Sequence, residues 1–244
     1  MRKLGIIPAR YKSSRFPGKP LIEILGIPMI IRVANIVADA LGKENTIIAT
    51  EDNRIKKLVE SYDFQVVMTS ENCLTGTDRV WEVAKQIKAD IYINIQGDEP
   101  VLDPRDILKI AEEKVNFPDY VINGMIDIGS NEDPNNINIP KVLVNRNNEL
   151  IYMSRLAIPG KKEQTTDLPK YKKQVCIYAF SYNDLKAYGE ANGKAEYEKF
   201  EDIEILRFFD FNIPIKMVET SRNSLAVDVI EDVANVERYL KGQS

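Results

Sequence analysis

The alternation of short apolar runs with amphipathic segments is the feature that most restricts the fold of this chain. Buried strands are predicted at four apolar runs: residues 4–7, 45–50, 65–68 and 90–96. Between them, residues 28–41 and 54–62 are predicted to be helical, and Gly42 is a natural end for the first helix. Strands that alternate with helices favour an α/β fold, in which three layers enclose a mostly parallel sheet.

The middle of the chain has a different pattern. Residues 121–127 could form another strand, and residues 131–138, which are rich in Asn, Asp and Pro, are typical of a long loop. Residues 141–145 and 150–154 predict a β-hairpin. We therefore expect a small antiparallel insertion, over about residues 128–182, that could cover a binding site as a lid.

The remaining segments continue the alternation. Residues 173–180 predict a strand, and helical amphipathicity explains the leucines and isoleucines of residues 200–207. A terminal amphipathic helix is predicted through Val233, Val236 and Leu240.

The absence of histidine excludes several classes of chemistry. With no histidine among 244 residues, the chain has neither a Ser-His-Asp triad nor a Cys-His pair, and it cannot bind zinc through histidine. A net charge of -4 gives no electrostatic footprint for nucleic acid or an anionic membrane. Two cysteines favour a reducing, cytoplasmic location, and we expect neither a membrane span nor a secretory leader.

A basic loop follows the first predicted strand. Arg10, Lys12, Arg15 and Lys19 lie within ten residues of one another, among small residues that let backbone amides approach a ligand. The loop could cradle a nucleotide triphosphate at the carboxyl end of the strand, or it could be a solvated basic turn. It matches neither the Walker A motif nor the dinucleotide fingerprint.

Two further motifs carry carboxylates and hydroxyls. Residues 96–100, Gln-Gly-Asp-Glu-Pro, follow a predicted strand, so Asp98 could hold Mg²⁺ opposite the basic loop, or it could simply close an acidic turn. Residues 75–79, Thr-Gly-Thr-Asp-Arg, open a predicted helix, where Thr77 or Asp78 could act only as a cap.

These motifs resemble the motifs of one family, and they follow one another along the chain in the same order as in that family. The segment Ile-Pro-Ala-Arg-Tyr-x-Ser-Ser-Arg-Phe-Pro-Gly-Lys-Pro-Leu, with the segments at 75–79, 96–100, 152–159 and 227–232, resembles the CMP-Kdo synthetases. These enzymes are the 3-deoxy-manno-octulosonate (Kdo) cytidylyltransferases, which activate an acidic eight-carbon sugar with CTP. The resemblance implies one nucleotidyltransferase domain over residues 1–244, of the nucleotide-diphospho-sugar transferase type, and a homodimer packed through the insertion.

The resemblance also implies roles for individual residues. Arg10, Lys19 and Asp98 are the expected catalytic residues, and Asp98 and Asp228 the expected Mg²⁺ ligands. The expected nucleotide-binding residues are Pro8, Ala9, Arg10, Ser13, Arg15, Lys19, Thr75, Gly76, Arg79, Gln96 and Asp98. The expected sugar-binding residues are Arg79, Arg155, Gln174, Tyr178 and Glu204.

The chain departs from the family pattern mainly where the sugar would bind. Gln174, Cys176 and Ile205 stand where the family usually has histidine, glycine and glutamine. These departures suggest either a modified substrate, such as an amino-substituted Kdo, or sequence drift with compensating contacts. The same motifs could also belong to a nucleotidyltransferase that acts on a phosphorylated sugar or polyol, or to a catalytically inactive relative.

Overall fold

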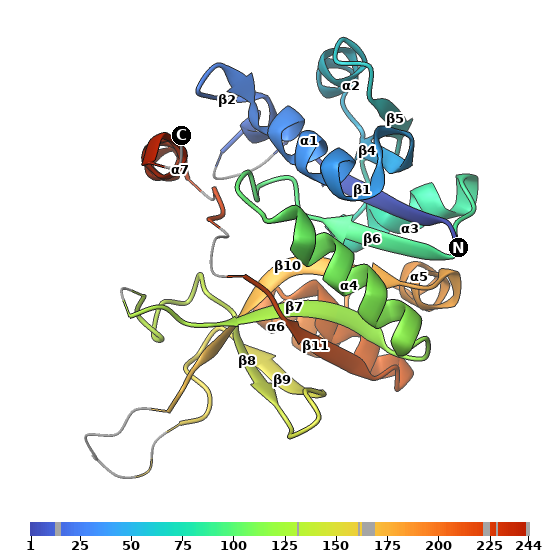
Figure 1. Cartoon of the computed structure of the whole chain (residues 1–244). Coiled ribbons are helices and arrows are strands. Elements are labelled where there is room, and N and C mark those ends of the chain that lie inside the picture. The colour runs from blue at the N-terminus through green and yellow to red at the C-terminus, as the bar shows by residue number, and fades with distance from the viewer. Residues whose placement is uncertain are drawn as a thin grey trace.

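A mixed sheet runs through the centre of the computed structural model, which describes residues 1–12, 16–130, 132–160, 162, 169–221, 225–227 and 229–242. Its strands lie in the order β11-β7-β10-β6-β1-β4-β5, and β8 and β9 extend it beside β10 (Figure 1). The strands are β1 (Lys3–Ala9), β4 (Thr46–Thr50), β5 (Gln65–Met68), β6 (Ile91–Ile95), β7 (Val121–Asp127), β8 (Lys141–Val144), β9 (Leu150–Ser154), β10 (Lys172–Phe180) and β11 (Ile215–Glu219). A separate small hairpin joins β2 (Glu23–Ile24) to β3 (Ile27–Pro28).

The helices follow the strands in alternation. The α-helices are α1 (Met29–Leu41), α2 (Asn53–Glu60), α3 (Gly76–Gln86), α4 (Pro104–Asn116), α5 (Tyr182–Gly189), α6 (Glu196–Glu201) and α7 (Ile230–Gly242). Three 3₁₀ segments among the described residues are η1 (Lys19–Leu21), η2 (Lys43–Asn45) and η3 (Glu204–Phe211).

Strand β10 runs against the direction of its neighbours. It pairs antiparallel with both β6 and β7, whereas β6, β1, β4 and β5 pair in parallel, as do β7 and β11. The register of β10 against β7 shifts between Val175 and Tyr178. The buried amide of Asn123 closes this bulge, because its Nδ2 donates to the carbonyls of Val175 and Ile177, both at 2.9 Å.

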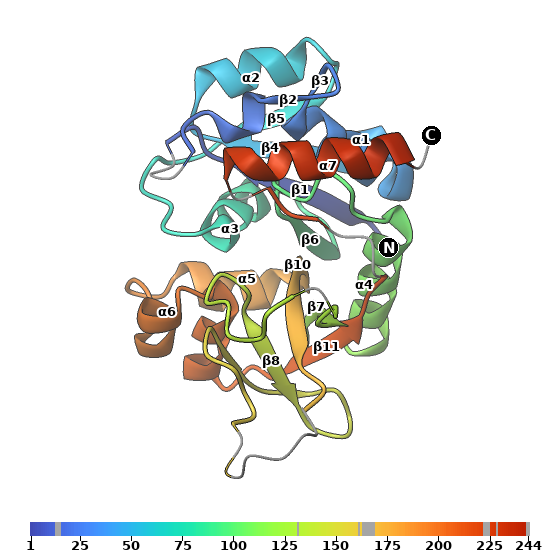
Figure 2. The same ribbon diagram turned by 90° about the vertical axis from the view of Figure 1, so that its left-hand side faces the viewer.

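Apolar residues on the two faces of the sheet build separate cores. Helices α1, α2 and α4 contribute to one core with residues such as Val33, Ile55 and Ile110. Helices α3 and α5 and the η3 segment contribute to the other, with Trp81, Tyr188 and Phe208. Figure 2 shows α3, α5 and α6 on one side of the sheet and α4 on the other. The predicted three-layer α/β fold is therefore confirmed.

Helix α7 packs on a third, smaller cluster. Val227 and Val236 are fully buried there with Ile24 and Met29, and Phe16 of the basic loop packs against them. The backbone amide of Leu25 also donates to the carboxylate of Glu237 at 3.1 Å. The small cluster thus joins the end of the described chain to the basic loop and to the β2–β3 hairpin.

Most predicted elements are observed with shifts of one or two residues at their ends. The hairpin of β8 and β9 is present, and β8 pairs with β10, which makes the hairpin an extension of the main sheet. Residues 200–207 are not one continuous helix, because α6 ends where Asp202 adopts a left-handed backbone (φ 49°), and a 3₁₀ segment follows. Helices α4 and α5 and strand β11 are observed in addition to the predicted elements.

Candidate active site

A cleft of about 350 Å³ opens where the parallel strands β1 and β6 end. The carboxyl edge of a parallel sheet is where open α/β folds bind ligands, because several loops converge there. Every predicted nucleotide- or sugar-binding residue that the structure describes lines this cleft: Pro8, Ala9, Arg10, Lys19, Thr75, Gly76, Arg79, Gln96, Asp98, Arg155, Gln174, Tyr178 and Glu204. Ser13, Arg15 and Asp228 lie outside the described residues, so their predicted roles stay predictions.

The base of the basic loop is held by backbone and carboxylate contacts. The amide of Gly18, which has a φ of 73°, donates to the carbonyl of Tyr11 at 2.9 Å. The amide of Tyr11 donates to Oε1 of Glu51 at 3.0 Å, and the guanidinium of Arg54 lies 3.2 Å from the centre of the Tyr11 ring. The loop is thereby closed at its ends, and the exposed Arg10 lies at the cleft.

Lys19 and Asp98 form an ion pair inside the cleft. Nζ of Lys19 lies 2.7 Å from Oδ2 of Asp98, and their side chains are 17% and 27% exposed. Nζ of Lys19 also donates to the carbonyl of Val227 at 2.9 Å, and the amide of Val227 donates to the Asp98 carbonyl at the same distance. The cation of the basic loop, the carboxylate after β6 and the segment before α7 therefore meet at one point.

The turn at the start of α3 forms a capping box. Thr75 Oγ1 accepts from the amide of Asp78 at 3.2 Å, and Oδ2 of Asp78 accepts from the Thr75 amide at 2.8 Å. A capping role is predicted for Thr77 or Asp78; Asp78 does take part in the box, but the cap itself is Thr75, and the amide of Thr77 instead donates to Glu204. A Cβ on Gly76 would meet Nε2 of Gln96 at 2.9 Å and Cγ of Pro8 at 3.2 Å, so a larger residue here would have to displace the Gln96 amide.

Glu204 links the same turn to strand β6. Its carboxylate accepts from the amide of Thr77 at 3.0 Å and from Nε2 of Gln96 at 3.0 Å. Removal of this carboxyl group from water raises the pKa of Glu204, against the opposing effect of the hydrogen bond from Thr77. The carboxyl group of Glu204 therefore accepts two hydrogen bonds at the cleft, and burial disfavours its ionised form in the folded chain.

The two arginines predicted to bind the sugar are both engaged by protein acceptors. The guanidinium of Arg79 pairs with Glu51 at 2.7 Å and donates to Thr69 Oγ1 at 2.6 Å. Arg155 donates from Nη1 to the carbonyl of Ile137 at 2.9 Å, from Nη2 to that of Asp202 at 3.0 Å and from Nε to that of Glu201. These contacts give both arginines a scaffolding role, and a contact with the sugar stays a prediction.

A hydrogen-bonded strip along β10 forms the wall that departs from the family pattern. Nε2 of Gln174 donates to Oδ1 of Asn123 at 3.0 Å and to the hydroxyl of Tyr178 at 3.3 Å. Burial raises the pKa values of Cys176 and Tyr178 well above their ordinary values, so both groups remain protonated. The wall at this point is therefore uncharged.

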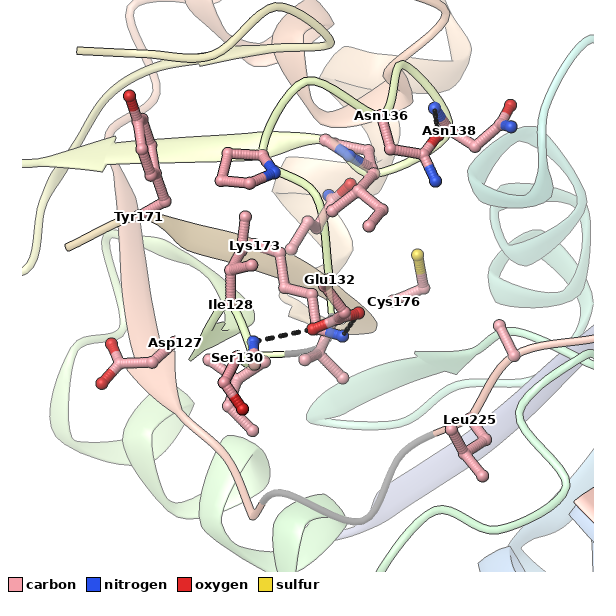
Figure 3. Close-up of a pocket in the computed structure, with 18 of the residues that line it drawn as sticks. Asp127, Ile128, Ser130, Glu132, Asn136, Asn138, Tyr171, Lys173, Cys176 and Leu225 are labelled. Carbon is pink, nitrogen blue, oxygen red and sulfur yellow. Dashed lines mark hydrogen bonds and ion pairs between the residues drawn. The ribbon is translucent and has the colours of Figure 1, made fainter. Parts of the chain in front are cut away.

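A second, larger cavity of about 1120 Å³ lies beyond this wall (Figure 3). It shares Gln174 and Cys176 with the cleft and extends along the loop before β8. An ion pair between Lys173 and Glu132 crosses it, and the amide of Gly129 donates to Oε2 of Glu132 at 2.8 Å. The cleft at the strand ends thus adjoins a chamber of mixed polar and apolar lining on the side of Gln174.

Several contributors to the site are absent from the sequence prediction. Glu51 fixes both Tyr11 and Arg79, and its position directly after a predicted parallel strand is a signal that could have identified it. Lys194 and Asp202 form an ion pair of 2.8 Å at the cleft, and the hydrogen bond from Lys194 lowers the pKa of Asp202. No sequence motif marks that pair.

The fold and the cleft together define an α/β nucleotide-binding protein of the nucleotidyltransferase class. A family model described as "Cytidylyltransferase" matches residues 4–216. The chain is 38% identical over 241 residues to the 3-deoxy-manno-octulosonate cytidylyltransferase of Solibacter usitatus, with 98% of this chain and 94% of the relative covered. The chain therefore belongs to the 3-deoxy-manno-octulosonate cytidylyltransferase family, as the motifs predicted.

Two further similarities bear on the substrate and the fold. The 8-amino-3,8-dideoxy-manno-octulosonate cytidylyltransferase of Shewanella pealeana is 36% identical over 241 residues, with 96% of this chain and 97% of the relative covered. A solved structure of CMP:2-keto-3-deoxy-manno-octonic acid synthetase complexed with CTP has a TM-score of 0.91, 32% identity and full coverage of both chains. The chain is thus almost equally identical to the Kdo enzyme and to the amino-Kdo enzyme, so overall identity does not distinguish the two sugar specificities.

The raised pKa of Glu204 predicts a specific pH dependence of stability. Glu204 makes its full contribution below the ordinary glutamate pKa, and that contribution is lost as the pH rises through the higher pKa of the folded chain. Glu204→Gln lacks this titration. As the pH rises across this window, the free energy of unfolding of the wild type should therefore fall relative to that of the variant. Urea unfolding of both proteins from about pH 4 to about pH 8 measures the difference. Parallel stability curves would contradict the assigned shift.

Proposed function

We propose that this chain transfers CMP from CTP to the anomeric hydroxyl of Kdo or a closely related acidic keto-sugar and releases pyrophosphate. The observation that carries this proposal is the convergence of the basic loop, the Lys19–Asp98 pair and the Gln174–Tyr178 wall on one cleft. The shared family of the chain supports CTP as the donor. The product fits a role in lipopolysaccharide or capsule precursor synthesis.

Charge neutralisation is the first task of such a site. The attacking sugar oxygen must approach an α-phosphate that is already anionic, so fixed cations lower the barrier when they are positioned beforehand. Arg10 and Lys19 supply such cations from the basic loop, and Lys19 is the best placed to follow charge on the departing pyrophosphate. Orientation in the cleft supplies the second contribution, and no histidine base is required.

Mg²⁺ is the proposed cofactor. Among the described residues no three acidic, cysteine or histidine side chains gather as a ready-made metal centre. Mg²⁺ commonly keeps several waters and binds through one or two carboxylates plus substrate phosphates, so the partly exposed carboxylate of Asp98 fits it. Asp228 is the proposed second ligand. Bound Mg²⁺ would neutralise phosphate charge and lower the pKa of the sugar hydroxyl.

The identity of the sugar is the finer part of the proposal. The neutral wall of Gln174, Cys176 and Tyr178 has no cation to pair with the sugar carboxylate, whereas a histidine there could be charged. Because Gln174 and Cys176 depart from the family's sugar-facing pattern, an amino-substituted Kdo is a candidate beside Kdo itself, and drift with compensating contacts is the competing explanation. Competition between Kdo and 8-amino-Kdo for one enzyme sample measures the ratio of specificity constants that decides between them.

We also propose a homodimer that works in the cytoplasm. Exposed apolar side chains gather where the insertion meets α6: Phe200 is 83% exposed, Leu156 70% and Ile137 61%. Arg155 connects the three segments through its hydrogen bonds to their backbone carbonyls, so the segments that carry these side chains are neighbours, and we propose that a second copy covers them. No helix among the described residues is long and apolar enough to cross a bilayer.

The direct test of the proposed function is pyrophosphate release by the purified protein. The assay uses CTP and Mg²⁺ with Kdo, 8-amino-Kdo, sialic acids and sugar phosphates as separate acceptors. Release that requires CTP and a Kdo-type acid supports the proposal. Release with a sugar phosphate alone would move the assignment to a different nucleotidyltransferase.

Asp98→Asn should lower turnover by on the order of 10² or more, because a metal ligand acts on charge that develops in the transition state. Titration of Mg²⁺ at saturating CTP measures both turnover and metal dependence. Asp103→Asn is the matched control, since Asp103 caps α4 and asparagine caps a helix equally well. Wild-type turnover of the Asp98 variant at limiting Mg²⁺ would remove Asp98 from the metal site.

Lys19→Ala should lower turnover by on the order of 10² and weaken CTP binding much less, because Lys19 acts on charge at the leaving group. Lys12→Ala should change both constants little. Lys12 contacts Glu71 at 3.5 Å with both side chains mostly exposed, which makes it a matched cation outside the cleft. Equal defects in the two variants would show that the loop acts only as a diffuse basic patch.

Replacing both Phe200 and Leu156 with serine should shift the protein from dimer to monomer, because the variant removes apolar area that the proposed interface would bury. Sedimentation velocity at micromolar protein measures the change. Leu108→Ser, on the exposed face of α4, serves as the control. A wild-type protein that sediments as a monomer would refute the proposed assembly.

A further inference from the structure

Buried side chains that do not line the cleft support the Thr75–Gly76–Thr77 turn on the side away from the cleft. Tyr188 and Arg207 are buried under it, and Arg207 is only 1% exposed. They come from α5 and η3, on the same side of the sheet as α3, as Figure 2 shows for α5. The proposed nucleotide-binding residues therefore rest on groups far away in the sequence.

The hydrogen bonds of the Thr75 hydroxyl show how Tyr188 acts on it. This hydroxyl donates its proton to Oδ2 of Asp78 at 2.9 Å. Its oxygen lies 2.9 Å from the hydroxyl of Tyr188, and another acceptor within reach of that hydroxyl, Oε1 of Glu198, is farther away at 3.5 Å. Since the Thr75 proton is already donated to Asp78, we assign Tyr188 as the donor to Thr75. A fully buried hydroxyl of Tyr188 thus fixes the orientation of the residue that caps α3.

Arg207 holds the other carboxylate oxygen of the capping box. Its Nη1 donates to Oδ1 of Asp78 at 2.9 Å, while Nε and Nη2 bind both oxygens of Glu198 at 2.7 and 2.6 Å. The guanidinium carbon also lies 3.8 Å from the centre of the Tyr188 ring. Because such a bidentate pair has little freedom, the position of Asp78 follows that of α6.

We propose that Tyr188 is a positioning residue for nucleotide binding, which it supports by fixing Thr75, and that Arg207 assists it through Asp78. This inference rests on the proposed function, in which the turn contacts CTP. Loss of the Tyr188 hydroxyl leaves the ring packed on Phe208, and the Thr75 hydroxyl then loses this partner and keeps its contacts with Asp78. A less firmly held turn has to be ordered further by the nucleotide at the moment of binding.

The test compares Tyr188→Phe with Tyr92→Phe. Tyr92 is equally buried, but its hydroxyl contacts the amide of Ala89 and the carbonyl of Ile87. Tyr188→Phe should raise the Kd for CTP about 3- to 10-fold, the range expected for one net hydrogen bond, with turnover at saturating CTP nearly unchanged. Tyr92→Phe should leave both constants unchanged even if it lowers the melting temperature as much.

A double-mutant cycle with Thr75→Val separates direct action from general loosening. If Tyr188 acts through Thr75, adding Tyr188→Phe to Thr75→Val should raise the Kd no further. Arg207→Lys, which keeps the charge but loses the fork, should also raise the Kd and gives a second readout.

Three results would each overturn the inference while the proposed function stands. They are an unchanged Kd in Tyr188→Phe, equal rises in Tyr188→Phe and Tyr92→Phe, and additive effects in the cycle. A wild-type protein that neither binds CTP nor releases pyrophosphate would overturn the proposed function itself, and the inference with it.

Discussion

Strand β10 is the connection on which the two halves of the molecule depend. It pairs with β6, whose end carries Asp98, and with β7 and β8, which lead into the insertion. Its antiparallel direction brings residues 174–178 to the same edge where the parallel strands end. The bulge in β10 requires an internal donor, and Asn123 supplies it to two carbonyls at once. Residues that line the cleft from both halves of the molecule therefore share one sheet.

The polar residues around the cleft support one another in layers. Glu51 holds the basic loop and Arg79 together, and Glu204 holds the α3 turn against Gln96. Each of these carboxylates accepts from groups on two different elements. Since few of their partners face solvent, loss of one contact of such a carboxylate should also weaken its contact with the second element.

Much of the fold and site could be predicted from the sequence, because the signals are local. The strand runs, the Thr75–Asp78 capping box and the placement of Asp98 after β6 all follow from patterns within a few residues. The break at Asp202 could not be predicted, because a helical pattern continues across it and the left-handed residue that ends the helix is an aspartate, not a glycine. The carbonyl partners of Arg155 are equally invisible, since backbone acceptors leave no trace in the sequence.

The contact between Lys19 and Val227 joins positions 208 residues apart. Closing so long a loop carries a large entropic cost, which is met only when the intervening sheet already holds both ends near each other. During synthesis on a ribosome, the basic loop emerges 208 residues before this partner, so the contact cannot form until residue 227 has been made. This edge of the cleft is therefore assembled late, and a nascent chain carries its cationic loop without the contact to Val227 until that residue has been made.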